Sequence, residues 1–271
     1  MTFNSKRQLS EFLSEDIGKG DITSKLLSKK KITARIISRE NAIVAGVEYA
    51  KEIFRLKGCN VAISKKDGTK VKPNQTIMSI VGDAGRILTC ERTALNLLSR
   101  MSGIATQTNE LVKQIPNKTK VYATRKTAPG LRYFDKEAVE IGGGKKHRLR
   151  LDEMIMIKDN HIAVEGSLSA LIKKAKKKYK KFEIEVENIP DAILAAREGA
   201  TIIMLDNFPP SKIKKTIKVL KNKKLRSKVM LEASGGINSK NIHNYGKTGV
   251  DIISVGSITN SVKGIDMSLE I

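Results

Sequence analysis

From residue 120 onward the chain alternates short apolar runs with amphipathic helical patterns, and this alternation limits its possible folds more than any other feature. The apolar runs lie at 120–123, 154–157, 182–186, 201–205, 228–231 and 250–255. The helical patterns lie at 130–140, at 167–178 with Ser167 as the N-cap, and at 190–198, 210–222 and 238–247. Strands and helices that alternate at this spacing predict parallel βα units.

Each apolar run is followed by polar or charged residues or by glycine. These residues are Arg125 and Lys126, Lys158 and Asp159, Glu185 and Glu187, Asp206 and Asn207, Glu232 with Ser234, Gly235 and Gly236, and finally Gly256 and Ser257. In a doubly wound sheet such groups gather at one switch point, whereas in a barrel the carboxyl ends of all strands converge on one mouth. Six strands that end in this way favour an α/β barrel.

We expect this barrel to be incomplete. A full eightfold barrel takes about 250 residues, and the rhythmic part of the chain offers only about 140. Six strands are expected, or seven if residues 147–151 form a short extra strand. The first hundred residues predict a separate small α/β domain, with strands at 31–40 and 76–81, a helix at 46–57, turns at 67–69 and 82–85, and a long helix from about Glu91 to Ile115.

The net charge of +23 invites comparison with nucleic-acid-binding proteins. Residues 173–181 and 212–224 hold seven lysines each and no acidic residue, so the rest of the chain carries only +9. Lysine without interleaved aromatic or arginine residues gives only nonspecific attraction to nucleic acid. A solvated lysine face is therefore favoured, and a basic nucleic-acid-binding protein is the alternative from another class.

The composition, 40% apolar and 29% charged, is typical of a globular protein. No apolar run approaches the roughly 20 residues that span a bilayer, and the polar N-terminus lacks the apolar stretch of a signal peptide. Cys59 and Cys90 have no metal-binding spacing. We expect a cytoplasmic protein that binds no membrane and no specific nucleic acid.

A group of basic residues lies at or near the predicted strand ends: Arg125, Lys126, Arg148 and Lys158, with His147 beside them. Clustered cations are costly unless an anion neutralises them. Arginine matches a carboxylate with a bidentate fork, and lysine acts as a compact point charge. The barrel mouth is therefore predicted to hold small, multiply charged anions.

Two carboxylates, Glu187 and Asp206, lie near the ends of consecutive predicted strands. They could pair with the basic residues or hold a divalent cation, since Mg²⁺ binds through one or two carboxylates together with substrate phosphates. Their spacing leaves both alternatives open. The glycine loops at 234–236 and 256–257 follow the last two strands, where backbone N–H groups often form a phosphate site.

Seven stretches of the chain resemble the quinolinate phosphoribosyltransferases, or carboxylating nicotinate-nucleotide pyrophosphorylases. They are EDIGKGDITS at 15–24, ERTALNLLSRMSGIAT at 91–106, ATRKTAPGLR at 123–132, GGGKKHRLRLDEMIMIKDNHI at 142–162, EVEN at 185–188, MLDNF at 204–208 and LEASGGI at 231–237. The resemblance runs nearly end to end. It implies an N-terminal α/β sandwich domain at 1–102, an incomplete α/β barrel at 103–263, and a C-terminal tail at 264–271 that returns to the first domain.

The resemblance also implies the reaction. Quinolinate and phosphoribosyl pyrophosphate would give nicotinate mononucleotide, pyrophosphate and carbon dioxide, a step of NAD biosynthesis, with Mg²⁺ as the cofactor. It further implies a homodimer, or a higher oligomer built from it, in which Arg92 completes the site of the neighbouring chain.

Site roles follow from the same resemblance. The quinolinate carboxylates would bind Arg92, Arg125, Arg148 and Lys158, with His147 lining the pocket and Thr124 preceding Arg125 in the TRKT motif. Glu187 and Asp206 would contact the ribose hydroxyls and a Mg²⁺ on the pyrophosphate, and Lys126 would meet pyrophosphate or carboxylate charge. Ser234, Gly235, Gly236, Gly256 and Ser257 would receive the 5′-phosphate. Catalysis would rest on Lys126, Lys158, Glu187 and Asp206.

Two residues add detail to the resemblance. The run GSITNS places Asn260 where the family commonly has a histidine, and His161 is expected to hold the Lys158 loop rather than to bind substrate. A paralogue with another acceptor, such as the ModD-like proteins associated with molybdate transport genes, is the alternative within the same fold. The paired arginine and lysine positions favour quinolinate, because a monoacid would leave cations unmatched.

Overall fold

The structure is a computed structural model that describes residues 3–271, and the chain divides into two compact units. The first unit comprises the residues up to Asn109 together with Pro129–Gly143 and Ser261–Ile271. The second unit comprises Glu110–Ala128 and Gly144–Asn260. The sequence placed the domain boundary between residues 102 and 103, so it did not predict that residues 129–143 belong to the first unit.

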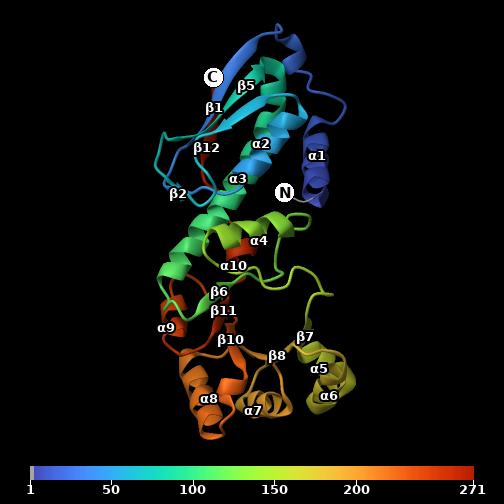
Figure 1. Cartoon of the computed structure of the whole chain (residues 1–271), viewed down its shortest axis with the longest axis vertical. Helices are drawn as coiled ribbons and strands as arrows, with labels where there is room; N and C mark the ends of the chain where they lie inside the picture. The colour runs from blue at the N-terminus through green and yellow to red at the C-terminus, as the bar shows by residue number, and fades with distance from the viewer. Residues whose placement is uncertain (1–2) are drawn as a thin grey trace. The chain divides into compact units, whose positions relative to one another are not determined.

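A four-stranded antiparallel sheet organises the first unit (Figure 1). Its order is β12 (Met267–Glu270), β1 (Lys31–Ser38), β5 (Thr76–Asp83) and β3 (Asn60–Ile63). The short strands β2 (Ala42–Ile43) and β4 (Lys70–Val71) form a separate pair. The helices are α1 (Phe3–Ile17), α2 (Val47–Leu56), α3 (Ala84–Lys113) and α4 (Arg132–Ile141), with a 3-10 turn at Ser24–Leu26. The strand nearest the C-terminus thus lies at the sheet edge beside β1.

The inserted segment belongs to the first unit because α4 buries its side chains there. Phe134 is fully buried, and its ring meets that of Tyr49 edge-on with 5.0 Å between the centroids. Asp135 is also fully buried and accepts hydrogen bonds of 2.7 and 2.9 Å from the guanidinium of Arg100 on α3. A two-point charged contact of this kind fixes both the position and the orientation of α4.

Helix α3 begins earlier than the sequence pattern suggested, and the expected turn at 82–85 does not form. Strand β5 continues to Asp83, whose carboxylate accepts a hydrogen bond of 3.2 Å from the backbone N–H of Arg86. This contact caps the first turn of the helix, so the strand passes directly into it. The sequence patterns do not predict α1 or β3.

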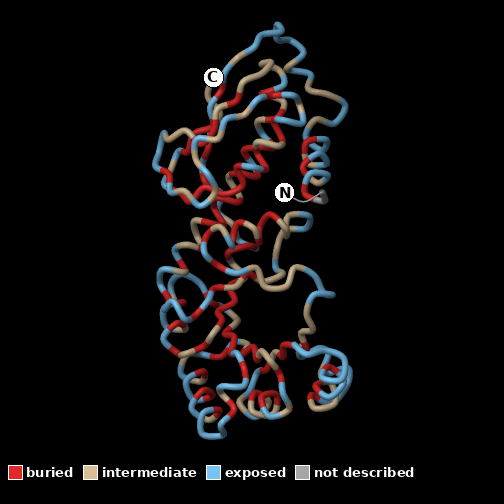
Figure 2. The backbone as a smooth tube through the Cα atoms, in the orientation of Figure 1, coloured by how far each residue is buried: buried red, intermediate tan, exposed pale blue. Residues whose placement is uncertain are grey.

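Six parallel strands form the sheet of the second unit, as Figure 1 shows. Their order is β6 (Lys120–Tyr122), β11 (Ile252–Ser254), β10 (Met230–Ser234), β9 (Ile202–Asp206), β8 (Phe182–Val186) and β7 (Ile155–Ile157). The helices are α5 (Asp159–Glu165), α6 (Leu168–Lys178), α7 (Ile189–Glu198), α8 (Pro210–Asn222), α9 (Ile242–Gly246) and α10 (Ser257–Asn260), with a 3-10 turn at Arg226–Lys228. The predicted fold class, an α/β chain with an incomplete parallel barrel after a first α/β domain, is confirmed. Figure 2 shows that the strands of this sheet are largely buried, whereas α7 and α8 alternate between buried and exposed residues along their length.

The extra strand expected at 147–151 is wrong. These residues form an irregular segment, and the nearby strand-like contact is an isolated bridge between Lys145 and Tyr122. His147 has a positive φ of 52°, a left-handed conformation that a strand cannot contain. The chain therefore turns inward at His147 instead of extending the sheet. Ser167, by contrast, caps α6 as predicted, because its hydroxyl accepts the Ala170 N–H at 3.2 Å.

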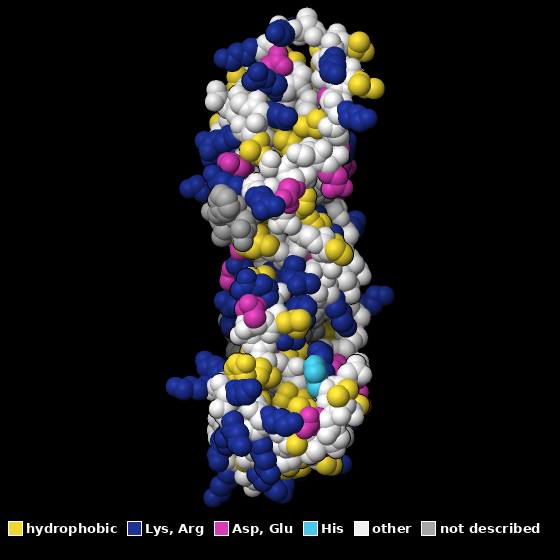
Figure 3. Space-filling model, turned by 90° about the vertical axis from the view of Figure 1, so that its right-hand side faces the viewer, with side chains coloured by type: hydrophobic (Ala, Val, Ile, Leu, Met, Phe, Trp, Pro, Cys, Tyr) yellow, Lys and Arg dark blue, Asp and Glu magenta, His cyan; other side chains and the backbone are white. Residues whose placement is uncertain are grey.

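The lysine-rich segments are amphipathic helices, as predicted. In α8 the side chains of Ile213, Ile217 and Leu220 are buried, and most of the lysines between them are exposed. Figure 3 shows basic side chains gathered on the part of the second unit drawn lowest. Among residues 3–271, no helix has the length and apolar character needed to cross a membrane.

Candidate active site

The carboxyl ends of the six parallel strands enclose a cavity of about 350 Å³. Every strand contributes to its wall or passes into a loop that does. The lining residues are Ala123, Thr124, Arg125, Lys126, His147, Arg148, Met156, Lys158, Glu185, Met204, Asp206, Glu232, Ser234 and Ser254. Most of the residues chosen from the sequence therefore surround one space.

Volume alone would not select this cavity. A larger one, of about 540 Å³, lies in the first unit, and Arg100 is the one basic residue among those that line it. That arginine is already paired with the buried carboxylate of Asp135. The smaller cavity combines several cations with carboxylates and hydroxyls, which is the donor set of an anion-binding active site.

The loop after β6 places Thr124, Arg125 and Lys126 at the rim. The backbone N–H of Lys126 donates to the Thr124 hydroxyl at 3.1 Å, and the Lys126 carbonyl accepts the Thr259 hydroxyl at 2.8 Å. These bonds hold the main chain while the basic side chains line the cavity. The buried Nε of Arg125 has no hydrogen-bond partner within the described chain. An anion in the cavity would supply one.

A second guanidinium, that of Arg148, lines the same cavity. Its Nη1 donates to the Met154 carbonyl at 2.9 Å, which fixes the direction of the side chain. Burial lowers the pKa of Arg148, and the nearby charge of Arg125 lowers it further, against the opposing effect of Glu183. The two arginines therefore repel one another where they line the cavity. A ligand with two negative charges would relieve that repulsion.

Lys158 follows β7 and forms an ion pair with Glu185 of β8 across the cavity wall. Its backbone N–H donates to Nδ1 of His161 at 3.0 Å, at the start of α5. The expectation that His161 holds the Lys158 loop is confirmed.

Of the two predicted carboxylates, Asp206 lines the cavity and Glu187 does not. Strand β8 ends at Val186, so Glu187 lies beyond it, is exposed, and accepts the Lys212 ammonium on its backbone carbonyl at 2.7 Å. The carboxylate that β8 presents to the cavity is Glu185. Since side chains alternate along a strand, Glu183 and Glu185 share the inner face.

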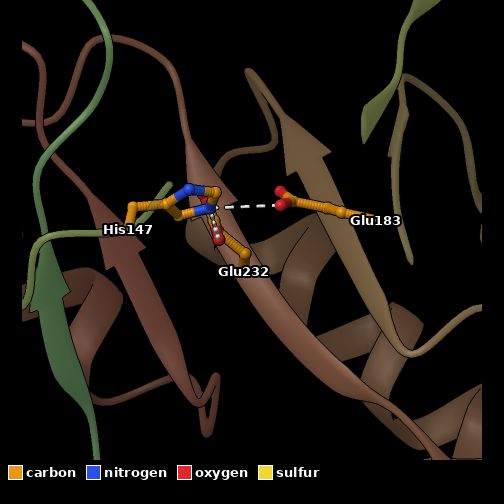
Figure 4. A group of neighbouring side chains, drawn as sticks. All are labelled: His147, Glu183 and Glu232. Carbon is orange, nitrogen blue, oxygen red and sulfur yellow. Dashed lines mark ion pairs between the residues drawn. The ribbon is translucent and has the colours of Figure 1, made fainter. Parts of the chain in front are cut away.

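Beneath the cavity, His147 lies between two fully buried carboxylates, Glu183 of β8 and Glu232 of β10 (Figure 4). Its Nε2 is 3.1 Å from Oε2 of Glu183 and 3.7 Å from Oε2 of Glu232. Burial opposes the charged imidazolium, but the two carboxylates outweigh it and raise the pKa of His147 to about 9. Burial, followed by the charge of Glu232, raises the pKa of Glu183.

The glycine loops flank the rim, although among them only Ser234 lines the cavity. Gly235 has φ of 95°, and a Cβ there would lie 2.9 Å from the backbone nitrogen of Asn207, so only glycine fits. A Cβ on Gly256 would lie 3.4 Å from Cδ of Lys126. Gly236 and Ser257 adjoin these loops without reaching the cavity wall.

Arg92 is not among the residues that line this cavity. It is exposed on α3 in the first unit, and the cavity residues all belong to the second unit. Glu183 and Ser254 were not predicted from the sequence, and Glu185 and Glu232 were noted at the strand ends without a role. In β8 every second residue is a glutamate, and this alternation is the sequence signal that points to Glu183 and Glu185.

Comparison with known proteins gives concordant results. Residues 21–102 match the family described as quinolinate phosphoribosyl transferase, N-terminal domain, and residues 104–270 match its C-terminal domain. A probable carboxylating nicotinate-nucleotide pyrophosphorylase of Methanothermobacter thermautotrophicus is 43% identical, over 97% of each chain. A plant relative from Nicotiana tabacum, a mitochondrial decarboxylating quinolinate phosphoribosyltransferase, is 36% identical and covers 100% of this chain and 83% of its own. The solved nicotinate-nucleotide pyrophosphorylase of Francisella tularensis superposes with a TM-score of 0.92 at 41% identity, over 98% of this chain and 95% of the other.

Proposed function

The chain belongs to the quinolinate phosphoribosyltransferase family, and we propose that the cavity at its barrel mouth is where quinolinate and phosphoribosyl pyrophosphate react. The enzyme transfers the phosphoribosyl group to quinolinate with decarboxylation. The products are nicotinate mononucleotide, pyrophosphate and carbon dioxide, and the reaction belongs to NAD biosynthesis.

The observation that carries this assignment is the pair of guanidinium groups, Arg125 and Arg148, that share one cavity with Lys158. Quinolinate carries two adjacent carboxylates, and each can accept a bidentate fork from an arginine. The unpartnered Nε of Arg125 supports a direct contact with one of them. His147 would line the same pocket and limit how deeply the ring enters.

The phosphoribosyl half would occupy the side of the cavity formed by the end of β9 and the loops that follow β10 and β11. Ser234 and the backbone of Gly235 and Gly236 would receive the 5′-phosphate, with Gly256 and Ser257 closing the opposite side. Asp206 and Glu185 would accept hydrogen bonds from the ribose hydroxyls. Glu185 replaces Glu187 in this role, because Glu185 lines the cavity and Glu187 does not.

The donor set also fits Mg²⁺ brought in on the pyrophosphate. Asp206 is a half-buried carboxylate at the cavity, whereas Glu185 is already paired with Lys158, so Asp206 is the residue that would hold the ion. Magnesium needs only one or two protein carboxylates when phosphates supply the remaining ligands. When bound, it would neutralise charge on the leaving pyrophosphate.

Catalysis by this chain would consist of positioning and electrostatics. Arg125 and Arg148 would hold the ring so that its nitrogen faces C1′ of the ribose. The carboxylates of Asp206 and Glu185 would stabilise the positive charge that develops on the ribosyl group, and Lys126 would stabilise the departing pyrophosphate. The quaternised ring nitrogen then accepts the electron pair released when carbon dioxide leaves.

The assembly would be a homodimer, or a higher oligomer of such dimers, in which Arg92 of each chain completes the other's site. An exposed arginine on α3 is available for that role. We also place the enzyme in the cytoplasm. Its two cysteines are free and buried, which is the state that a reducing compartment maintains.

The test is the reaction itself. Purified protein is incubated with quinolinate, phosphoribosyl pyrophosphate and Mg²⁺, and nicotinate mononucleotide is followed by chromatography. Arg125→Ala should abolish product formation, whereas Lys215→Ala, a change on the exposed face of α8, should leave it unchanged. A folded wild-type protein that forms no product would overturn the assignment.

A further inference from the structure

The proposed reaction requires a proton that none of the roles above supplies. When the carboxylate next to the ring nitrogen leaves as carbon dioxide, its bonding electron pair stays on the ring carbon. A proton must bind that carbon before nicotinate mononucleotide is complete. Because this inference rests on the proposed function, the donor is sought among groups connected to the same cavity.

A cluster of three ionisable side chains lies beneath the cavity, and the binding roles do not account for two of them. Glu183 and Glu232 are fully buried, and the side chain of His147 between them is only 8% exposed. Nε2 of His147 lies 3.1 Å from Oε2 of Glu183 and 3.7 Å from Oε2 of Glu232, and within the described chain Oε1 of Glu183 has no hydrogen-bond partner. These short separations allow a proton to pass among the three side chains.

The same three residues have the composition of a metal site, and all their candidate ligand atoms lie within 4.8 Å of one another. The histidine tautomer argues against a metal. The backbone N–H of Arg148 donates to Nδ1 of His147 at 2.7 Å, so in the neutral ring Nε2 carries the hydrogen, and the imidazolium that the raised pKa of His147 favours carries it there as well. A protonated Nε2 cannot be a metal ligand, and it points the hydrogen toward the carboxylates.

The cluster therefore holds at least the proton on Nε2. Two fully ionised carboxylates side by side in a buried site would repel one another strongly, which favours a second proton on the pair. That second proton is the mobile one. It can reside on Glu183, on Glu232, or on the imidazole at the expense of the Arg148 contact.

One member of the cluster connects it to the cavity. Oε1 of Glu232 accepts a hydrogen bond of 2.5 Å from the hydroxyl of Ser254, and both residues line the cavity wall. A separation of 2.5 Å is typical of a hydroxyl bound to a carboxylate, a geometry in which protons exchange readily. Ser254 lies at the end of β11, beside β10 that carries Glu232.

We propose that His147, Glu183 and Glu232 store the proton that replaces the lost carboxylate, and that Ser254 delivers it. In the step itself, Glu232 is protonated and donates to the Ser254 oxygen, the reverse of the hydrogen bond that the structure shows between them, and the hydroxyl proton of Ser254 passes to the ring carbon as a new C–H bond forms. The Ser254 oxygen takes the proton held by Glu232 in the same event, which leaves Glu232 ionised. Glu183 and His147 then pass a proton back to Glu232, and water replenishes the cluster between turnovers.

Other charged or titratable groups surround the cluster. Arg148 interacts with Glu183, and Arg125 lies near Arg148. Burial, followed by the charge of Glu232, raises the pKa of the Tyr122 phenol. The ring of Tyr122 also meets that of His147 edge-on at 5.7 Å. None of these groups lies between Ser254 and Glu232, so the route through the hydroxyl remains direct.

The experiment is a single-turnover reaction with enzyme in excess, in which pyrophosphate and nicotinate mononucleotide are measured separately. Pyrophosphate reports phosphoribosyl transfer, and the mononucleotide reports the completed decarboxylation. In Ser254→Ala and Glu232→Gln, pyrophosphate release should stay close to the wild-type rate. The mononucleotide should appear roughly 100-fold more slowly, the usual effect of losing a proton donor. Ser254→Thr keeps the hydroxyl and should restore the rate.

Solvent deuterium adds a readout that a structural defect would not change. The two slow variants should show a larger solvent isotope effect on mononucleotide formation than on pyrophosphate release. Equal slowing of both products, or no slowing of either, would overturn the proton store while leaving the proposed function intact. Absence of pyrophosphate from the wild type would instead remove the proposed function. One tightly bound metal ion per chain, lost in Glu183→Gln, would also overturn the proposal.

Discussion

The imidazole Nε2 of His147 lies 3.1 Å from a carboxylate oxygen of Glu183, and the carboxylate is fully buried on the inner face of β8. Glu183 and His147 are 36 positions apart in the sequence, on a strand and on an irregular segment that approaches it. The pair places a proton-binding site directly beneath a cavity whose wall is rich in cations.

This site predicts a definite dependence of stability on pH. The pKa of His147 rises from the ordinary value of 6.5 to about 9 in the folded protein, so folding favours the protonated cluster. Its contribution is complete below about pH 6.5 and is lost as the pH rises through about 9. Urea unfolding of the wild type and of His147→Gln across this range measures the effect. The variant should show a flatter profile, and parallel profiles would contradict the prediction.

The roles of Glu185 and Glu187 can be separated by two matched substitutions. Glu185→Gln changes a carboxylate that lines the cavity, and we expect kcat/KM to fall by about 100-fold. Glu187→Gln changes an exposed side chain beyond the end of β8, and we expect activity within about twofold of the wild type. Steady-state assays of both variants suffice. A larger loss in Glu187→Gln than in Glu185→Gln would restore the role that the EVEN motif suggested.

Arg148→Lys tests whether the guanidinium shape matters. Lysine keeps the charge but loses the planar fork and the 2.9 Å bond to the Met154 carbonyl. We expect the KM for quinolinate to rise by about tenfold or more, since hydrogen bonds to a charged group are worth about 1.5–3 kcal/mol. The KM for phosphoribosyl pyrophosphate should change little. An equal rise in both constants would indicate general disruption of the cavity.

The shared site can be tested by mixing two inactive variants. Arg92→Ala and Arg125→Ala should each be inactive alone, because each lacks one of the arginines that we propose contact the substrate. After subunit exchange, half of the dimers should be mixed, and each should contain one intact site, which gives roughly a quarter of wild-type activity. Size-exclusion chromatography provides the oligomeric state. If the mixture stays inactive although subunits exchange, Arg92 acts within its own chain.

The barrel could be predicted because each of its elements carries a strong local pattern. The run at 182–186 and the helix at 210–222 have the observed bounds, since apolar continuity and a proline at the helix start are local signals. The start of α3 was missed because its cap, Asp83, is still part of strand β5. A direct passage from a strand into a helix leaves no break in the pattern of apolar residues that would mark where the helix begins.

The site was harder to predict than the fold. Arg125, Lys126, Lys158 and Asp206 were identified by their positions after apolar runs, and all line the cavity. Glu183 and Glu232 lie within their strands, where a charged residue reads as an interruption of the pattern. Alternation along β8 points to Glu183, but Glu232 is recognised as its neighbour only once β8 and β10 are known to flank β9 and to share an inner face. The strand predicted at 147–151 does not form because the positive φ of His147 turns the chain.

The pairing of β12 with β1 also concerns the order in which the protein is made. Residues 267–270 bond to residues 35–38, so a ribosome must translate more than 200 codons between the two halves of this ladder. All six strands of the second unit are synthesised in that interval, whereas the first sheet still lacks its edge. The nascent chain therefore keeps an open strand edge on β1 until the final stretch emerges. Premature termination near the C-terminus would leave that edge exposed for aggregation.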